Sequence, residues 1–147
     1  MPIIAINKQA RQEYEILDKF EAGIKLTGSE VKSCKLGGAN LKGSYAIINE
    51  RGLVYLLACH ISPYRHGIKN DYDPVRSRVL LLRQKEIASL IGKLKEKRYT
   101  LVPLALHNNH GLIKVELGLG RGKKQYEKRA AIKKRDIERE IGRRLKH

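Results

Sequence analysis

The sequence predicts a mainly β fold, a small antiparallel OB-type barrel with about three helices, followed by a basic C-terminal arm. Gly, Asn and Pro divide residues 1–120 into about six short strand-forming segments, with turns roughly every 8–12 residues. One longer segment has helical periodicity. The arm, residues 121–147, carries +8 of the chain's net charge of +16. A β-sandwich fits the same pattern and stays open as the alternative.

The first elements are two short helices around a strand. Asn7 is a residue type that caps helices, and it predicts a short helix that continues through Tyr14. The segment 15–26 is rich in strand formers. A second helix is predicted over 29–35, with Ser29 as its capping residue, ending at the glycines 37–38.

A hairpin and a loop follow in the middle of the chain. Segments 44–48 and 53–59 read as strands joined by a turn at Asn49-Glu50-Arg51-Gly52. The polar segment 62–74, bounded by prolines, predicts a loop, and the apolar segment 79–82 predicts a short strand.

The last predicted elements are a helix and a second hairpin. Apolar residues Ile87, Leu90, Ile91 and Leu94 recur at helical spacing, which predicts an amphipathic helix over 85–97 with one buried face. Segments 101–106 and 112–119 form a hairpin around residues 108–111. In the final strand apolar residues alternate with Lys114, Glu116, Gly118 and Gly120, so one face should be exposed to solvent.

The glycines at 118, 120 and 122 are interpreted as a flexible hinge between two domains, a barrel over 1–120 and an arm over 121–147. The arm has twelve Lys and Arg against four Asp and Glu. This density favours a polyanion, most often a nucleic acid, over a merely soluble basic surface or a membrane-bound helix. Ile137, Ile141 and Leu145 form only a narrow apolar stripe. We therefore expect the arm to be disordered when free and to become helical when it binds RNA.

Several classes of protein are disfavoured by what the sequence lacks. It contains no apolar run of membrane-spanning length and no signal peptide, which predicts a cytoplasmic protein with Cys34 and Cys59 reduced. His107 and His110 straddle a turn, so we expect no metal site there and no cofactor. His60 and His66 leave a ribonuclease as an alternative, although no nucleophile or acid–base pair is evident. The sequence predicts a protein that is not an enzyme.

Motifs along almost the whole chain resemble one family. They are Asn7-Lys8-x-Ala10-Arg11-x-Glu13-Tyr14, Phe20-Glu21-Ala22-Gly23-Ile24, Leu26-Thr27-Gly28-x-Glu30-Val31-Lys32-Ser33, Ala39-Asn40-Leu41, Ser44-Tyr45, His60-Ile61-Ser62-Pro63-Tyr64, Asp73-Pro74-x-Arg76-x-Arg78, Gly122-Lys123-Lys124, Lys128-Arg129 and Ile132-Lys133. Together they are similar to the SsrA-binding protein (small protein B, SmpB) family.

The resemblance implies an OB-type barrel that binds the tRNA-like domain of transfer-messenger RNA. It also implies delivery of that RNA, in a complex with elongation factor Tu, to ribosomes stalled on messages without a stop codon. The arm would then enter the empty messenger channel near the decoding centre. A general RNA-binding or ribosomal OB protein is the alternative.

The resemblance also suggests particular site residues. The candidates for RNA contact are Asn7, Glu21, Glu30, Lys32, Asn40 and Leu81. Three of them have simpler alternative roles, in which Asn7 merely caps a helix, Glu30 merely favours the positive end of the second helix and Leu81 belongs to the core. The candidates in the arm for ribosome contact are Lys123, Lys124, Tyr126, Glu127, Lys128, Arg129, Ile132, Lys133, Lys134 and Arg135.

Overall fold

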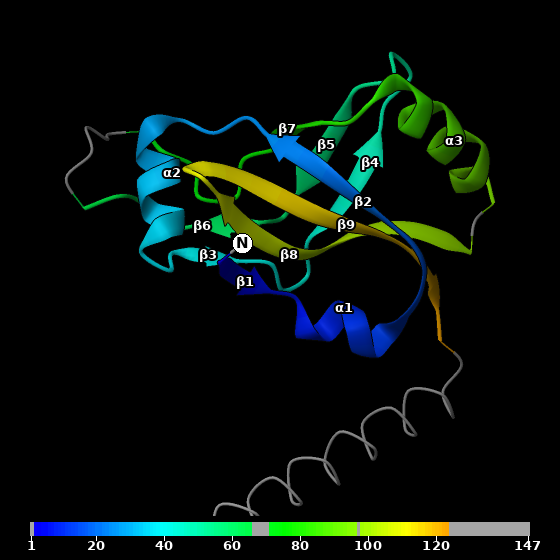
Figure 1. Cartoon of the computed structure of the whole chain (residues 1–147), viewed down its shortest axis with the longest axis horizontal. Helices are drawn as coiled ribbons and strands as arrows, with labels where there is room; N and C mark the ends of the chain where they lie inside the picture. The colour runs from blue at the N-terminus through cyan, green and yellow to red at the C-terminus, as the bar shows by residue number, and fades with distance from the viewer. Residues whose placement is uncertain (1, 66–70, 97, 124–147) are drawn as a thin grey trace, which may run out of the picture.

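A closed antiparallel barrel forms the body of the chain (Figure 1). The structure is a computed structural model, and it describes residues 2–65, 71–96 and 98–123. Within these residues the strands are β1 (Ile3–Ile6), β2 (Tyr14–Ile24), β3 (Ala39–Asn40), β4 (Tyr45–Ile48), β5 (Val54–Leu57), β6 (His60–Ile61), β7 (Arg78–Leu81), β8 (Tyr99–Asn109) and β9 (Leu112–Gly122). The helices are α1 (Lys8–Glu13), α2 (Gly28–Lys35) and α3 (Gln84–Leu94).

The ring of strands follows the order β8-β4-β5-β7-β2-β9 and closes through pairing of β9 with β8. Strand β1 adds to the free part of β8, where Ile6 pairs with Ala105. Strands β3 and β6 form a separate two-stranded sheet. The predicted mainly β barrel is therefore confirmed, and the ring closure distinguishes it from a sandwich.

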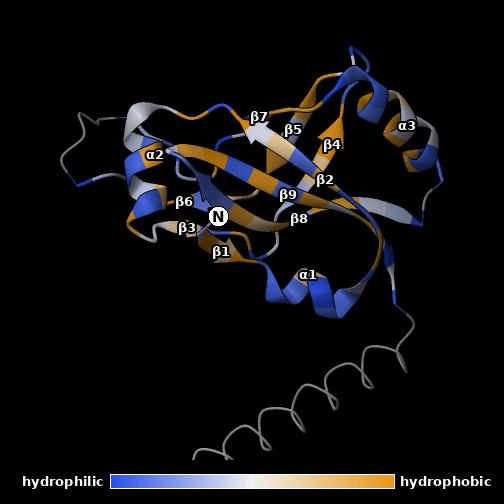
Figure 2. Cartoon of the chain, viewed as in Figure 1, coloured by the Kyte–Doolittle hydropathy of each residue, from blue (hydrophilic) through white to orange (hydrophobic). Residues whose placement is uncertain are grey.

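The barrel interior is filled by the inward faces of the strands. Leu56, Leu101, Leu106, Val115 and Leu117 are each no more than 1% exposed, and they belong to one continuous apolar cluster. Figure 2 shows the alternation of hydrophobic and hydrophilic residues along β9. This period of two places every second side chain in the core.

Helices α2 and α3 lie at opposite ends of the long axis in Figure 1. Leu90 of α3 is fully buried, and Ile87 and Leu94 pack partly against the core. The prediction that Ile91 shares this buried face is wrong, because its side chain is 39% exposed. Helix α3 thus buries a narrower stripe than its sequence pattern predicts.

The hinge interpretation of Gly118 and Gly120 is wrong. Both residues are buried within β9, where Gly118 pairs with Val102 and Gly120 with Thr100. A Cβ on Gly118 would lie 2.9 Å from Leu104 Cδ1 and 3.1 Å from Ile16 Cγ2, so a larger residue would force these side chains to move. The predicted solvent-exposed face of β9 is therefore covered over this stretch, by a small second cluster of Ala10, Val102, Leu104, Tyr14 and Ile16.

Helix α2 begins one residue before its predicted start. Thr27, and not Ser29, is the N-cap: Thr27 Oγ1 accepts a hydrogen bond from the Glu30 N–H at 3.2 Å. The Glu30 carboxylate accepts one from the Thr27 N–H at 3.0 Å in return. This reciprocal capping box gives the helix a fixed start, and Gly37, at a φ of 86°, follows its end.

Candidate nucleic-acid interface

Asn7 is held inside the fold by both ends of its side-chain amide. Its Oδ1 accepts a hydrogen bond from the Ala10 N–H at 3.1 Å, as an N-cap of α1. Its Nδ2 donates to the Pro103 carbonyl oxygen of β8 at 2.9 Å. With only 3% of the residue exposed, Asn7 joins α1 to the barrel and presents little surface to a ligand.

Asn40 lies exposed beside Asn7, at a hollow next to α1. The two asparagines line this hollow together with Ile6, Lys8, Gln9, Gln12, Glu13 and Lys42. Asn40 Oδ1 accepts a hydrogen bond from the Lys42 N–H at 2.9 Å. Lys8 and Lys42 are exposed, so this hollow combines amide groups with two cations that suit phosphate.

Glu21 and Leu81 meet at a second hollow, where β2 pairs with β7. Gly23 lies opposite Leu81 in the register, and a Cβ on Gly23 would be 3.4 Å from Leu81 Cβ. The hollow is lined by Glu21, Gly23, Leu81, Leu82, Arg83, Glu86 and Lys114. Leu81 is 52% exposed, so the alternative that it belongs to the core is wrong.

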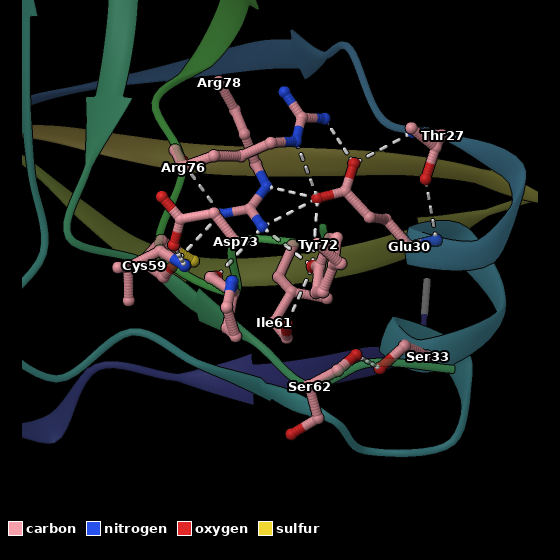
Figure 3. A network of polar contacts seen from close by, with 12 residues as sticks. Thr27, Glu30, Ser33, Cys59, Ile61, Ser62, Tyr72, Asp73, Arg76 and Arg78 are labelled. Atoms are coloured by element: carbon pink, nitrogen blue, oxygen red, sulfur yellow. Dashed lines mark hydrogen bonds and ion pairs between the residues drawn. The ribbon is translucent and has the colours of Figure 1, made fainter. Parts of the chain in front are cut away.

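Glu30 occupies a buried polar network between α2 and the segment before β7 (Figure 3). Its Oε2 accepts hydrogen bonds from Arg78 Nε at 2.7 Å and from Arg76 Nε at 3.1 Å, and its Oε1 accepts from Arg76 Nη2. The Tyr72 hydroxyl lies 3.2 Å from Oε2. The Glu30 side chain is 1% exposed, so its carboxylate faces protein groups and not the solvent.

The charge state of Glu30 follows from these partners. Burial by itself raises the pKa of a carboxyl group, because the charged form loses its hydration. Hydrogen bonds from Arg76, the Thr27 N–H and Arg78, together with the charge of Arg78, outweigh burial and lower the pKa of Glu30 from 4.5 to about 2. Arg78 is 0% exposed and also donates to the Cys59 carbonyl oxygen at 2.7 Å. The network is therefore a buried ion pair with its remaining polar groups satisfied.

Lys32 lies two residues after Glu30 on α2, with its side chain exposed. Its Nζ is 5.4 Å from the centre of the Tyr64 ring, within cation–π range. Lys32 is thus an accessible cation beside an aromatic ring, at the α2 end of the molecule (Figure 1).

Of the predicted arm contacts, only Lys123 belongs to the described residues. Its N–H donates to the Glu13 carbonyl oxygen at 2.9 Å, and its Nζ lies 3.3 Å from the Arg11 carbonyl oxygen. The arm thus leaves the barrel beside α1. The other predicted contacts lie outside the described residues: Lys124, Tyr126, Glu127, Lys128, Arg129, Ile132, Lys133, Lys134 and Arg135.

Cys34 and Cys59 are buried in the core, and His107 and His110 lie in the β8–β9 hairpin. Cys34 and Cys59 are free and fully buried, and burial raises the pKa of Cys34 to about 12 and that of Cys59 to about 11. His107 Nε2 lies 3.3 Å from Glu116 Oε2, whereas His110 is exposed in the turn at a φ of 50°. No group of three metal-ligating side chains occurs among residues 2–65, 71–96 and 98–123.

Sequence reasoning named Glu30 but missed the roles of Tyr64, Tyr72, Arg76 and Arg78. The spacing Arg76-x-Arg78 was visible, and Arg78 is the first residue of β7, where it is 0% exposed. A buried arginine is stable when a carboxylate pairs with it, so an arginine next to an apolar segment was the available signal for the pairing with Glu30.

The closed barrel, the two hollows with lysines in their lining and the basic charge define an OB-type nucleic-acid-binding protein. Among the described residues, no helix has the length and apolarity that crossing a membrane requires. The chain belongs to the SmpB family, whose model, SmpB protein, matches residues 4–147. This is a family of RNA-binding proteins without enzymatic activity, so the chain is not an enzyme.

Individual relatives match along nearly the whole chain. It is 51% identical to an SsrA-binding protein of Sulfurihydrogenibium sp., over 95% of this chain and 91% of the relative. It is 50% identical to that of Bacillus subtilis, over 96% and 90%. It is also 50% identical to that of Thermosipho melanesiensis, over 99% of both. A chain from a structure titled "tmRNA-SmpB: a journey to the center of the bacterial ribosome" is 44% identical, with a TM-score of 0.68 over 86% of this chain and 92% of that one.

Proposed function

We propose that this chain binds the tRNA-like domain of transfer-messenger RNA and delivers it to stalled ribosomes. The outcome would be trans-translation, which rescues the ribosome and tags the incomplete peptide. The observation that carries this proposal is the likeness of the whole barrel to the SsrA-binding relatives and to the chain of the ribosome structure.

The exposed candidates supply the direct RNA contacts. Lys32, Asn40, Glu21 and Leu81 all present side chains to solvent, with Lys42 and Lys114 beside two of them. Cations of this kind bind phosphates and set the register of the RNA, whereas carboxylate, amide and apolar groups contact bases. The buried Asn7 and Glu30 contribute indirectly, by holding α1 and α2 in place.

In this proposal the arm, residues 121–147, has a function separate from that of the barrel. Its net charge of +8 suits a channel lined by ribosomal RNA. The contacts assigned to it run from Lys123 to Arg135, in a segment that becomes helical at the small-subunit decoding centre. Elongation factor Tu is the third member of the delivered complex, and the cytoplasm is the place of action.

An RNA capture experiment tests the proposal. The full chain with an affinity tag is incubated in bacterial extract, and the bound RNA is sequenced. We expect strong enrichment of transfer-messenger RNA over other structured RNAs. Uniform recovery of unrelated RNAs would instead identify a general RNA-binding protein.

Two matched variants sharpen the capture experiment. Leu81→Gln changes an exposed leucine at the Glu21 hollow, and Ile91→Gln changes an exposed isoleucine of α3 outside the proposed surface. The first should lower recovery of transfer-messenger RNA, and the second should leave it unchanged. Equal recovery with both variants would contradict the placement of the RNA on this hollow.

A further inference from the structure

Hydrogen bonds connect helix α2 and the turn after it to the segment that follows β6. Ser33 Oγ donates a hydrogen bond to the Ser62 carbonyl oxygen at 2.6 Å, and the Ser62 N–H donates to the Gly38 carbonyl oxygen at 2.9 Å. These bonds place Tyr64, two residues further on, next to α2. There its ring lies 5.4 Å from Lys32 Nζ.

The two side chains offer complementary groups to a nucleotide. An ammonium group binds phosphate oxygens, and a tyrosine ring stacks on an unpaired base whatever the base sequence. The cation–π contact keeps the ammonium beside the ring, so one nucleotide can meet both groups. Lys35 and Arg65 are also exposed, and they add positive charge close to the pair in sequence.

The buried network anchors both sides of this pair. Glu30 belongs to the capping box that starts α2, one half-turn before Lys32. The Tyr72 hydroxyl lies 2.8 Å from the Ile61 carbonyl oxygen and 3.2 Å from Glu30 Oε2, so it connects β6 to α2. Arg78 completes the connection, with its Nη2 donating to the Tyr72 hydroxyl at 3.1 Å. Figure 3 shows these groups converging on the Glu30 carboxylate.

We propose that Lys32 and Tyr64 form one RNA-contacting element, which stacks an unpaired base and holds its phosphate, and that Glu30 is the positioning residue of this element. The inference rests on the proposed function, since it takes the tRNA-like domain as the RNA. It adds Tyr64 as a contact residue and gives Glu30 an indirect role.

Affinity measurements with a transcript of the tRNA-like domain test the contact residues. Tyr64→Ala should weaken binding about tenfold through loss of stacking, whereas Tyr64→Phe should bind like the parent because the ring remains. Lys32→Ala should weaken binding. It should also make the plot of log affinity against log salt concentration less steep by roughly 0.7–0.9, the value for one phosphate contact. Lys85→Ala, on the exposed face of α3, is the matched control and should change neither affinity nor slope. Parent-like binding by Tyr64→Ala would overturn the proposal.

A double-mutant cycle tests the positioning role of Glu30. Glu30→Gln should weaken binding several-fold in the parent background but have no further effect in a Lys32→Ala, Tyr64→Ala background, because the groups that it positions are gone. Tyr72→Phe provides a milder variant if Glu30→Gln unfolds, since it removes one hydroxyl only. An equal loss in both backgrounds would show a general structural role and overturn the assignment.

The two proposals fail in different ways. If the parent binds the tRNA-like transcript no better than a scrambled transcript of equal length, the proposed function fails. If the parent discriminates between the two transcripts but Tyr64→Ala binds like the parent, only the inference fails.

Discussion

Gly120 lies directly against the side chain of Tyr14, so that a Cβ at position 120 would be 2.9 Å from Tyr14 Cβ. Tyr14 is the first residue of β2, and Gly120 belongs to the last part of β9. The contact therefore forms where the first long strand of the barrel packs beside the last.

Gly120→Ala should destabilise the barrel by about 1–3 kcal/mol, because the added methyl group forces Tyr14 out of its packed position. Thermal unfolding followed by circular dichroism measures the change. Gly122→Ala is the matched control, since no atom lies within 4 Å of its added Cβ, and it should unfold like the parent. An unchanged melting temperature for Gly120→Ala would contradict the close packing of Gly120 against Tyr14.

Glu30→Gln should destabilise the chain at pH 7 by about 3–5 kcal/mol, because the buried Arg78 loses its counter-charge. The folded-state pKa of Glu30, about 2, lies below its ordinary value of 4.5. The stability that ionised Glu30 provides is therefore complete above pH 4.5 and is lost as the pH falls through about 2.

Urea unfolding at several pH values between 7 and 2 should show this dependence. The difference in the free energy of unfolding between the parent and Glu30→Gln should narrow below pH 4.5. Glu96→Gln is the control, because Glu96 pairs with Arg98 at an exposed site, and it should change stability by less than about 1 kcal/mol. A gap that stays constant down to pH 2 would contradict the low pKa of Glu30.

Asn7→Ala should lower stability by about 1–2 kcal/mol, since it removes the cap of α1 and the bond to Pro103. Asn7→Asp keeps the capping oxygen but not the donor, so it should fall between the parent and the alanine variant. Chemical denaturation measures the series. RNA affinity measured only on the folded fraction should fall less than after loss of a direct contact, because Asn7 is buried and acts only by holding α1 in place.

Glu21→Ala should weaken RNA binding without lowering stability, in contrast to Asn7→Ala. Glu21 is exposed and lies opposite Glu116 in the β2–β9 register, so its removal relieves a like-charge pair and should leave stability equal or slightly higher. Binding of the tRNA-like transcript should weaken. Unchanged binding would remove Glu21 from the proposed surface.

Removal of residues 124–147 deletes ten Lys and Arg and four Asp and Glu, a net loss of +6. We expect a lower salt slope and weaker binding to unrelated RNA, with binding to the tRNA-like domain retained. Reconstituted trans-translation should fail because no segment would occupy the messenger channel. Normal tagging by the truncated chain would contradict the role proposed for the arm.

Local signals made part of this fold predictable. The Asn49–Gly52 turn and the amphipathic pattern of α3 each depend on residues close in sequence. Strand β1 was missed because its partner β8 lies about a hundred residues away, and no local pattern specifies that pairing. The Thr27 cap could have been recognised, since Thr27-Gly28-Ser29-Glu30 has the capping-box spacing.

The candidate site was predictable only as a set of residue types. The exposure of Leu81 and the burial of Glu30 depend on the fold around them. From the sequence alone, both residues were therefore equal candidates for RNA contact. The glycines of β9 were misread for the same reason. Their need for small size comes from Tyr14 and Leu104, which lie far from them in the chain.

Closure of the barrel also has a consequence for its synthesis. Strand β2, residues 14–24, obtains its long partner only with β9, residues 112–122, and β1 must wait for β8. Such distant pairings fold slowly, and an emerging chain exposes the edges of β2 and β8 until the last strand arrives. A copy cut short before residue 112 would therefore lack a closed RNA-binding surface and tend to aggregate. If a broken message for this protein stalls a ribosome, its own unfinished product cannot help to release it.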